Sequence, residues 1–255
     1  MTKIKGLFTL ILTLFCQQAF ADKNNITVAV SSNFKNTLHQ LIRHYKQNNP
    51  KTYFKVSSGA TGLLYTQIKN GAPYDVFLAA DQRRPVLLDK ENLIIPNSRF
   101  TYAYGKLVFW HPKDNFHLTQ GSLGQAITNS RFISIANPDL APYGMAAEQS
   151  LKKLKLWEAA KYKVVMGNNI AQAYQFTASG NADLGLVALS QVITLKNNTY
   201  WVVPQKHYQP IVQQAVLLKN AITNDAAVDF IAFLKSSDSH NIIQRNGYGT
   251  SSDDD

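Results

Sequence analysis

The sequence predicts an α/β fold with mostly parallel sheets. Short apolar runs suited to buried strands alternate along the chain with segments of helical periodicity, which is typical of strand–helix–strand units. Glycine, proline and small polar residues stand between most of these segments, where they favour turns. No internal repeat or low-complexity linker interrupts the alternation.

The first third of the chain holds three predicted strands, at 26–30, 53–56 and 76–79. A helix is expected to begin near Phe34, because apolar residues recur 4, 7, 8 and 11 positions after it and share one helical face. The polar residues just before Phe34 suit the N-cap of this helix. A second helix is expected at 63–69, between a glycine-rich turn and the breaker Asn70-Gly71.

The rest of the chain continues the pattern. Further strands are predicted at 107–110, 133–136, 164–165, 184–188, 200–203 and 214–218. Further helices are predicted at 145–153, 170–177 and 226–235. The last residues, 251–255, are small and acidic, and we expect them to form a disordered tail.

The N-terminus has the layout of a secretory signal peptide at 1–21. Two lysines precede the apolar run 6–15, and an A-x-A pattern ends at Ala21. This run is too short to cross a bilayer, which needs about 20 residues. We therefore predict export and cleavage after Ala21. Cys16 leaves a lipoprotein as an alternative, although phenylalanine is a poor residue before a lipidated cysteine.

The 255-residue chain is basic, with a formal net charge of +10. The basic residues are spread over many segments, and no zinc-finger spacing, RNA-binding aromatic signature or basic tail is present. We therefore expect no nucleic-acid partner, and a surface field that attracts anions. Cleavage of the signal peptide would remove the single cysteine, so the exported chain would rely on apolar burial. Its length allows one large domain or two smaller ones.

Four predicted turns place glycine or small polar residues directly before a helix, at 31–33, 59–62, 142–144 and 167–170. The start of a helix has unpaired backbone N–H groups and a partial positive charge, which suit an anion. In open α/β sheets, ligands collect at the carboxyl ends of strands. Each turn alone is more simply explained as a helix cap, so the four together only modestly favour a shared anion site.

Longer motifs make the chain resemble the periplasmic molybdate-binding proteins of ABC importers. The most specific motif is Gly-Ala-Pro-Tyr-Asp-Val-Phe-Leu-Ala-Ala-Asp at 71–81. Other matching segments are 26–34, 57–63, 67–70, 136–138, 141–144 and 180–188. The similarity extends over about residues 26–248, nearly all of the chain after the predicted signal peptide.

The resemblance implies a type II periplasmic-binding-protein fold with two lobes, each a mostly parallel sheet flanked by helices. The first lobe would hold residues 22–104 and 215–255, and the second lobe residues 105–214. Strands near Leu107 and Gln214 would form the hinge, with the ligand in the cleft between the lobes. Ligand binding would then shift the population towards a closed state.

The resemblance also implies that neutral hydrogen-bond donors hold the oxyanion. Many family members have a tyrosine hydroxyl where this chain has Ala188, so Tyr143 is expected to supply that group. No catalytic residue, direct protein ligand to the metal or further cofactor is implied. The implied ligand-binding residues are Ser32, Asn33, Thr61, Tyr143 and, through its backbone N–H, Ile170.

The implied function is capture of molybdate, and of the similarly sized tungstate, by a periplasmic monomer that delivers it to an ABC permease in the inner membrane. A sulfate- or phosphate-binding protein is an alternative. A phosphate site would favour an acidic acceptor, but Asp75, Asp81 and Asp183 are predicted to cap helices or turns. A periplasmic enzyme is the alternative from another class, but the G-x-S-x-G and H-E-x-x-H motifs are absent.

Overall fold

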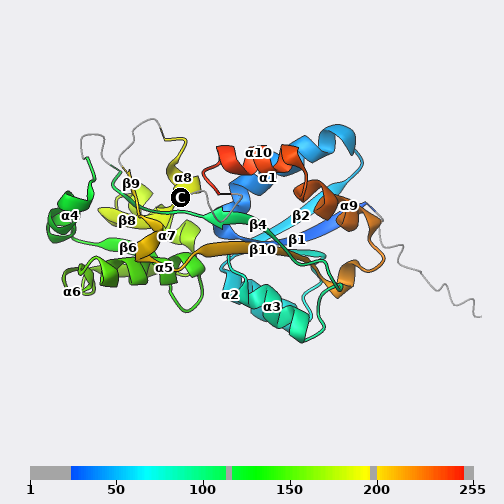
Figure 1. Ribbon diagram of the computed structural model, residues 1–255, viewed down its shortest axis with the longest axis horizontal. Helices are drawn as coiled ribbons and strands as arrows, with labels where there is room; N and C mark the ends of the chain where they lie inside the picture. Colours follow the sequence, from blue (N-terminus) through cyan, green and yellow to red (C-terminus); the bar gives the residue numbers. More distant parts are fainter. Residues whose placement is uncertain (1–23, 113–116, 196–199, 250–255) are drawn as a thin grey trace, which may run out of the picture.

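The computed structural model describes residues 24–112, 117–195 and 200–249, which form two α/β lobes side by side (Figure 1). The predictions of a signal peptide at 1–21, with Cys16 and cleavage after Ala21, and of a tail at 251–255 lie outside the described residues. Within the described ranges, no helix is both long and apolar enough to span a bilayer.

The first lobe is built on a five-stranded sheet with the order β2-β1-β3-β10-β4. Val28 of β1 lies opposite both Val56 of β2 and Val76 of β3, and these pairings are parallel. Strand β10 is antiparallel to both β3 and β4. The carboxyl ends of β1, β2 and β3 therefore meet at one end of the sheet. The strands are β1 (Asn25–Ser31), β2 (Tyr53–Gly59), β3 (Val76–Ala79), β4 (Phe100–Gly105) and β10 (Ile211–Leu217).

Helices cover both faces of this sheet (Figure 1). Val28 and Val30 pack on the face that holds Leu38, whereas Ala29 packs on the face that holds Leu64. This alternation follows from the two-residue repeat of a strand. One face carries α1 (Lys35–Asn48), α9 (Asp225–Leu234) and α10 (Ser237–Arg245), and the other carries α2 (Thr61–Lys69) and α3 (Arg83–Lys90).

The second lobe has a five-stranded sheet with the order β7-β6-β8-β5-β9, in which β6 is parallel to β7 and β8 and β5 is antiparallel to β8 and β9. Its strands are β5 (Leu107–Trp110), β6 (Ile133–Ala136), β7 (Val164–Gly167), β8 (Leu184–Ala188) and β9 (Tyr200–Val202). Its helices are α4 (Leu123–Asn129), α5 (Pro142–Lys153), α6 (Trp157–Ala160), α7 (Ile170–Ala178) and α8 (Leu189–Val192). Short 3-10 helices are η1 (Ser32–Phe34), η2 (Gln120–Ser122), η3 (Gln205–His207) and η4 (Lys219–Ala221).

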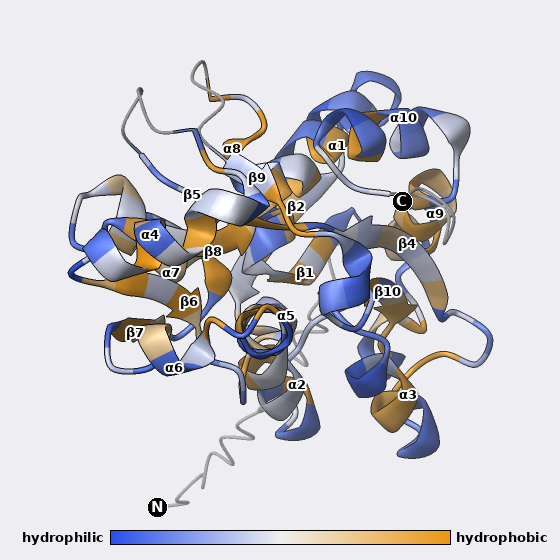
Figure 2. Ribbon diagram, turned by 60° about the vertical axis from the view of Figure 1, so that its left-hand side comes forward, coloured by the Kyte–Doolittle hydropathy of each residue, from blue (hydrophilic) through white to orange (hydrophobic). Residues whose placement is uncertain are grey.

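Apolar residues concentrate on the strands, as Figure 2 shows for β6 and β8, while α10 is largely hydrophilic. Every residue of β6 and β8 is buried. Ile133 and Ile135 of β6 belong to the main core of the second lobe, together with Phe109 of β5. The burial of these strands on both faces explains why they appear in the sequence as continuous apolar runs.

The α/β prediction is confirmed, and each sheet is mixed, with two parallel and two antiparallel pairings among its described strands. The prediction that a strand begins at Gln214 is wrong. Strand β10 begins at Ile211, which pairs with Gly105 of β4. Residues 211–214, placed in the second lobe by the predicted boundary, therefore pair within the first sheet. The physical reason is that two buried glutamines inside β10 interrupt its apolar pattern.

Candidate functional site

The structure brings all five predicted ligand-binding residues to one small cavity between the lobes. Ser32 and Asn33 lie in η1, Thr61 begins α2, and Tyr143 and Ile170 lie in the first turns of α5 and α7. The same cavity is lined by Ser31, Gly59, Ala60, Ala80, Ala141 and Pro142. Ala188, at the end of β8, is buried and is not among the lining residues. Whether the five residues bind a ligand stays a prediction.

On the first-lobe side of the cavity, two hydroxyl groups share one hydrogen bond. Ser31 Oγ and Thr61 Oγ1 are 2.6 Å apart, and both residues are buried. The backbone N–H of Ala80 donates to them, at 3.0 Å from Ser31 Oγ and 3.3 Å from Thr61 Oγ1. Because one hydroxyl donates to the other, one proton of the pair is left for a further acceptor. Ser31 lies in the predicted turn at 31–33 but is not one of the five predicted ligand-binding residues.

Three helix starts point backbone donors at the same region. In the described residues, the N–H groups of Thr61, Tyr143 and Ile170 have no acceptor. The side chain of Asn169 caps α7 by accepting from the N–H groups of Ala171 and Gln172, which leaves the N–H of Ile170 free. Free N–H groups at the start of a helix carry partial positive charge. The site can therefore stabilise an anion without a cationic side chain.

Close packing brings the start of α5 to the end of β6. A side chain at Gly144 would collide with the carbonyl oxygen of Ala136, the last residue of β6. Only glycine allows this approach, since it has no Cβ. The approach places Ala141, Pro142 and Tyr143 against the cavity.

Tyr143 is 1% exposed, and its hydroxyl accepts a hydrogen bond from Nε2 of Gln213 at 3.3 Å. Burial raises the pKa of this hydroxyl well above its usual value, so the group stays protonated at neutral pH. A side chain at Gly105 would collide with the Tyr143 hydroxyl and lie 2.8 Å from Gln213 Nε2. Gly105, at the end of β4, therefore makes room for the phenol.

The side-chain N–H groups of Asn33 donate to other residues of the protein. Its Nδ2 donates to Gln213 Oε1 at 2.9 Å and to the Tyr248 hydroxyl at 3.1 Å. Its Oδ1 is buried and has no hydrogen-bond partner among the described residues. Gln213 and Tyr248 were not predicted as part of the site, because they lie 180 and 215 positions from Asn33 along the chain.

The lobes contact each other across the cavity. The N–H of Gly62 in α2 donates to the carbonyl of Leu140 at 2.9 Å. The hydroxyl of Ser190 in α8 donates to the carbonyl of Asn33 at 3.2 Å. The cavity itself measures about 10 Å³, close to the room needed by one water molecule. The structure is therefore closed, and a tetrahedral oxyanion would require its walls to separate slightly.

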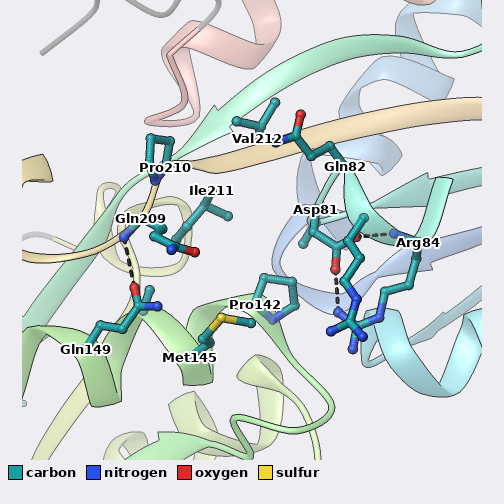
Figure 3. Close-up of a pocket in the computed structure, with 13 residues that line it drawn as sticks. Asp81, Gln82, Arg84, Pro142, Met145, Gln149, Gln209, Pro210, Ile211 and Val212 are labelled. Carbon is teal, nitrogen blue, oxygen red and sulfur yellow. Dashed lines mark hydrogen bonds and ion pairs between the residues drawn. The ribbon is translucent and has the colours of Figure 1, made fainter. Parts of the chain in front are cut away.

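Figure 3 shows the residues that line a larger cavity, whose volume is about 280 Å³. This cavity shares Ala80 and Pro142 with the small one. The turn at 81–84, helix α5 and residues 209–212 form its walls. Asp81 accepts from the backbone N–H of Arg84 at 2.9 Å and also pairs with the Arg84 guanidinium. Asp81 thus stabilises the turn before α3, which agrees with the predicted role in a turn or cap.

The other two aspartates also have structural partners. Asp75 accepts from the backbone N–H of Thr27 at 2.7 Å and from the Thr27 hydroxyl. The Arg131 side chain beside Asp183 holds the pKa of that carboxyl below its usual value. Neither aspartate lines the small cavity, which agrees with the predicted roles in turns and caps.

The sequence was compared with models of protein families to find the family of this chain. Residues 26–249 match the model of the bacterial extracellular solute-binding protein family. The chain belongs to this family. A protein of this family binds a solute outside the cytoplasmic membrane, which agrees with the closed cavity between two lobes.

Relatives within the solute-binding family share much of the sequence. The chain is 44% identical to the molybdate-binding protein ModA of Azotobacter vinelandii, over 90% of this chain and 91% of that protein. It is 39% identical to the molybdate-binding protein ModA of Rhodobacter capsulatus, over 90% of each. The structure of a periplasmic molybdate-binding protein from Azotobacter vinelandii matches with a TM-score of 0.83 and 39% identity, over 89% of this chain and 99% of that chain.

Proposed function

We propose that this solute-binding protein captures molybdate, and tungstate with it, in the periplasm and delivers the ion to an ABC permease. The observation that carries the proposal is that, among the residues that the structure describes, no charged side chain lines the small cavity, while hydroxyls and helix N-termini do. Such donors stabilise a dianion whose oxygens are all acceptors. The relatives named as molybdate-binding proteins support the choice of ion.

The same observation weighs against phosphate. Phosphate keeps a proton near neutral pH, and a site for it would favour a carboxylate acceptor. Within the described ranges, no aspartate or glutamate lines the small cavity. Sulfate carries no proton, so size must separate it from molybdate. Its shorter bonds would leave gaps at donors spaced for a larger ion, whereas tungstate is nearly as large as molybdate.

A thermal-shift panel tests the proposal. The purified exported protein is melted with molybdate, tungstate, sulfate or phosphate at equal concentrations. Molybdate and tungstate are expected to raise Tm by several degrees, because a ligand at 100 times its Kd adds about 2.7 kcal/mol to the free energy of unfolding. Sulfate and phosphate should have little effect. Equal shifts from all four anions, or no shift from molybdate, would contradict the proposal.

The oligomeric state and the processing of the protein can also be tested. We infer that it acts as a monomer, holds no resident cofactor, catalyses no reaction, and is released by cleavage after Ala21. Membership of the solute-binding family supports the absence of catalysis, and the A-x-A pattern that ends at Ala21 supports the cleavage. Intact-mass analysis of the exported protein should give a chain that begins at Asp22. Light scattering should give the mass of one chain with and without molybdate.

A further inference from the structure

Gln213 is a fully buried amide at the centre of a hydrogen-bond network beside the small cavity, but it does not line that cavity. It lies on β10, near the point where the chain passes between the lobes. Its Nε2 donates to the Tyr143 hydroxyl at 3.3 Å. Its Oε1 accepts from Asn33 Nδ2 at 2.9 Å and from the Tyr102 hydroxyl at 3.0 Å. The amide therefore joins η1 and β4 of the first lobe to α5 of the second.

This network fixes which way the amide faces. Oε1 accepts from Asn33 Nδ2, and the Tyr102 hydroxyl shares its one proton between Oε1 at 3.0 Å and the Ala79 carbonyl at 3.2 Å, so Nε2 is the atom turned towards Tyr143. A tyrosine hydroxyl has a single proton, and one that accepts from Nε2 directs this proton elsewhere. Gly105 packs against both the hydroxyl and Gln213 Nε2 and offers no side-chain acceptor. The Tyr143 proton is thus available to an acceptor in the cavity.

We propose that Gln213 is a positioning residue that keeps Tyr143 a hydrogen-bond donor towards the bound oxyanion, so that the site selects oxyanions without a proton. This inference rests on the proposed function. If an acceptor occupied the place of Nε2, the Tyr143 hydroxyl would donate to it and turn a lone pair towards the ligand. Two acceptors would then face each other, which is unfavourable.

The substitution Gln213→Glu tests this inference, because it should make the affinity for the oxyanion depend on pH. A protonated carboxyl can donate to Tyr143 and accept from Asn33, as the glutamine amide does. An ionised carboxyl is an acceptor only and adds a negative charge beside the site. The affinity of this variant should therefore depend on pH where that of the wild type does not.

The three tyrosines nearest this position have raised pKa values, so they stay protonated between pH 6 and pH 8.5. Tyr102 on β4 and Tyr143 on α5 contact the amide directly, and burial raises the pKa of both. Tyr248 contacts it through Asn33, and its pKa is raised for the same reason. Tyr208 acts electrostatically on Tyr143, and Asp81 is the charged group that acts on Tyr102. The new carboxyl would be the group that changes charge.

Isothermal titration calorimetry with sodium molybdate, between pH 6 and pH 8.5, tests the proposal. Gln213→Glu is expected to bind at least 100-fold more weakly than wild type at pH 8.5 and to regain affinity as the pH falls. Wild type should vary less than threefold. The matched control is Gln214→Glu, the next residue on β10, where Arg99 can pair with the new carboxylate. It should bind as wild type does at each pH.

The outcomes separate this inference from the proposed function. If wild type does not bind molybdate, the proposed function fails. If wild type binds but Gln213→Glu matches it at every pH, or is weak at every pH, the positioning role is overturned. Should Gln213→Glu fail to fold, Gln213→Met is measured alone and in a Tyr143→Phe background. If Gln213 acts through Tyr143, Gln213→Met should weaken binding about tenfold when Tyr143 is present. It should cause no further loss when Tyr143 is already replaced by Phe. Equal losses in both backgrounds would overturn the role.

Discussion

Gly105 shows how a residue without a side chain determines the chemistry of the site. It ends β4, and its missing Cβ leaves space for the Tyr143 hydroxyl and the Gln213 amide. Burial holds the phenol protonated, and the amide directs its proton. The donor character of the cavity therefore depends on neighbours that do not themselves contact the ligand.

Gly105→Ala should displace the Tyr143 hydroxyl and weaken molybdate binding by about 1–3 kcal/mol, the usual effect of losing one buried hydrogen-bond donor. Calorimetry measures the loss. In a double-mutant cycle, Gly105→Ala should cost less in a Tyr143→Phe background than in wild type, because the hydroxyl is gone and only the contacts with Cζ of residue 143 and Gln213 Nε2 remain. The control is Gly121→Ala, where a Cβ would meet no atom closer than 4.0 Å. Unchanged affinity in Gly105→Ala would contradict this account.

Helix α2 links the two lobes, because its first turn contacts both the cavity and the opposite lobe. Thr61 lines the cavity, and the next residue, Gly62, bonds to the carbonyl of Leu140. Arg84 of α3 lies beside this contact and donates to the carbonyl of Asp139 at 3.3 Å. Closure of the lobes thus brings donors of α2 and α3 onto the loop before α5.

Gly62→Ala should hold the lobes apart. Its Cβ would lie 3.1 Å from the Leu140 carbonyl oxygen and 3.0 Å from Arg84 Nη2, too close for an ordinary contact. We expect a loss of about 1–3 kcal/mol in binding, the usual cost of overpacking. The loss should be equal for molybdate and tungstate, since closure is affected rather than ion selection.

Calorimetry with both ions measures this effect, and small-angle scattering reports the opening as a larger radius of gyration with ligand. Leu63→Ala is the control, because Leu63 is the next residue of α2 and is 43% exposed. A variant that closes fully and binds both ions as wild type does would show that the contact at Gly62 is not required for closure.

Across the whole molecule, three buried tyrosines from different elements gather near the passage between the lobes. Tyr102, Tyr143 and Tyr248 come from β4, α5 and the C-terminal segment, and burial raises the pKa of each hydroxyl. Their ionisation in the folded protein would place charge in a region of low polarity. The free energy of unfolding should therefore depend on pH in the alkaline range.

The free energy of unfolding should fall as the pH rises above about 10, the pKa of tyrosine in an unfolded chain. Below that pH both states are protonated, and the contribution of these groups is intact. Above it the unfolded tyrosines lose protons and the folded ones do not, so each costs up to about 1.4 kcal/mol per pH unit. Urea denaturation from pH 8 to pH 11 measures the slope.

Tyr102→Phe should reduce this alkaline slope. Tyr162→Phe, at a position that is 87% exposed, is the control and should leave the slope unchanged. If Tyr102→Phe has the same slope as wild type, the buried hydroxyl does not contribute to the alkaline loss.

Several elements were not predicted because their signals are weak along the chain. Helix α3 carries Pro85 in its first turn, and α10 buries few apolar residues. Strand β4 lies at the edge of its sheet and is only partly buried. Tertiary contacts stabilise each of these elements. The periodicity and propensity of a short segment do not contain these contacts, so the sequence alone does not predict the element.

The sequence by itself determined the alternation of strands and helices and the helix starts that carry Ser32, Asn33, Thr61, Tyr143 and Ile170. These follow from short-range rules of periodicity, turns and caps, which neighbouring residues satisfy among themselves. Only the tertiary structure decided that Ser31 pairs with Thr61, that Gly105 makes room for Tyr143, and that Gln213 orients its hydroxyl. These contacts join residues distant in sequence, and a buried polar group takes its role from the partners that folding places beside it.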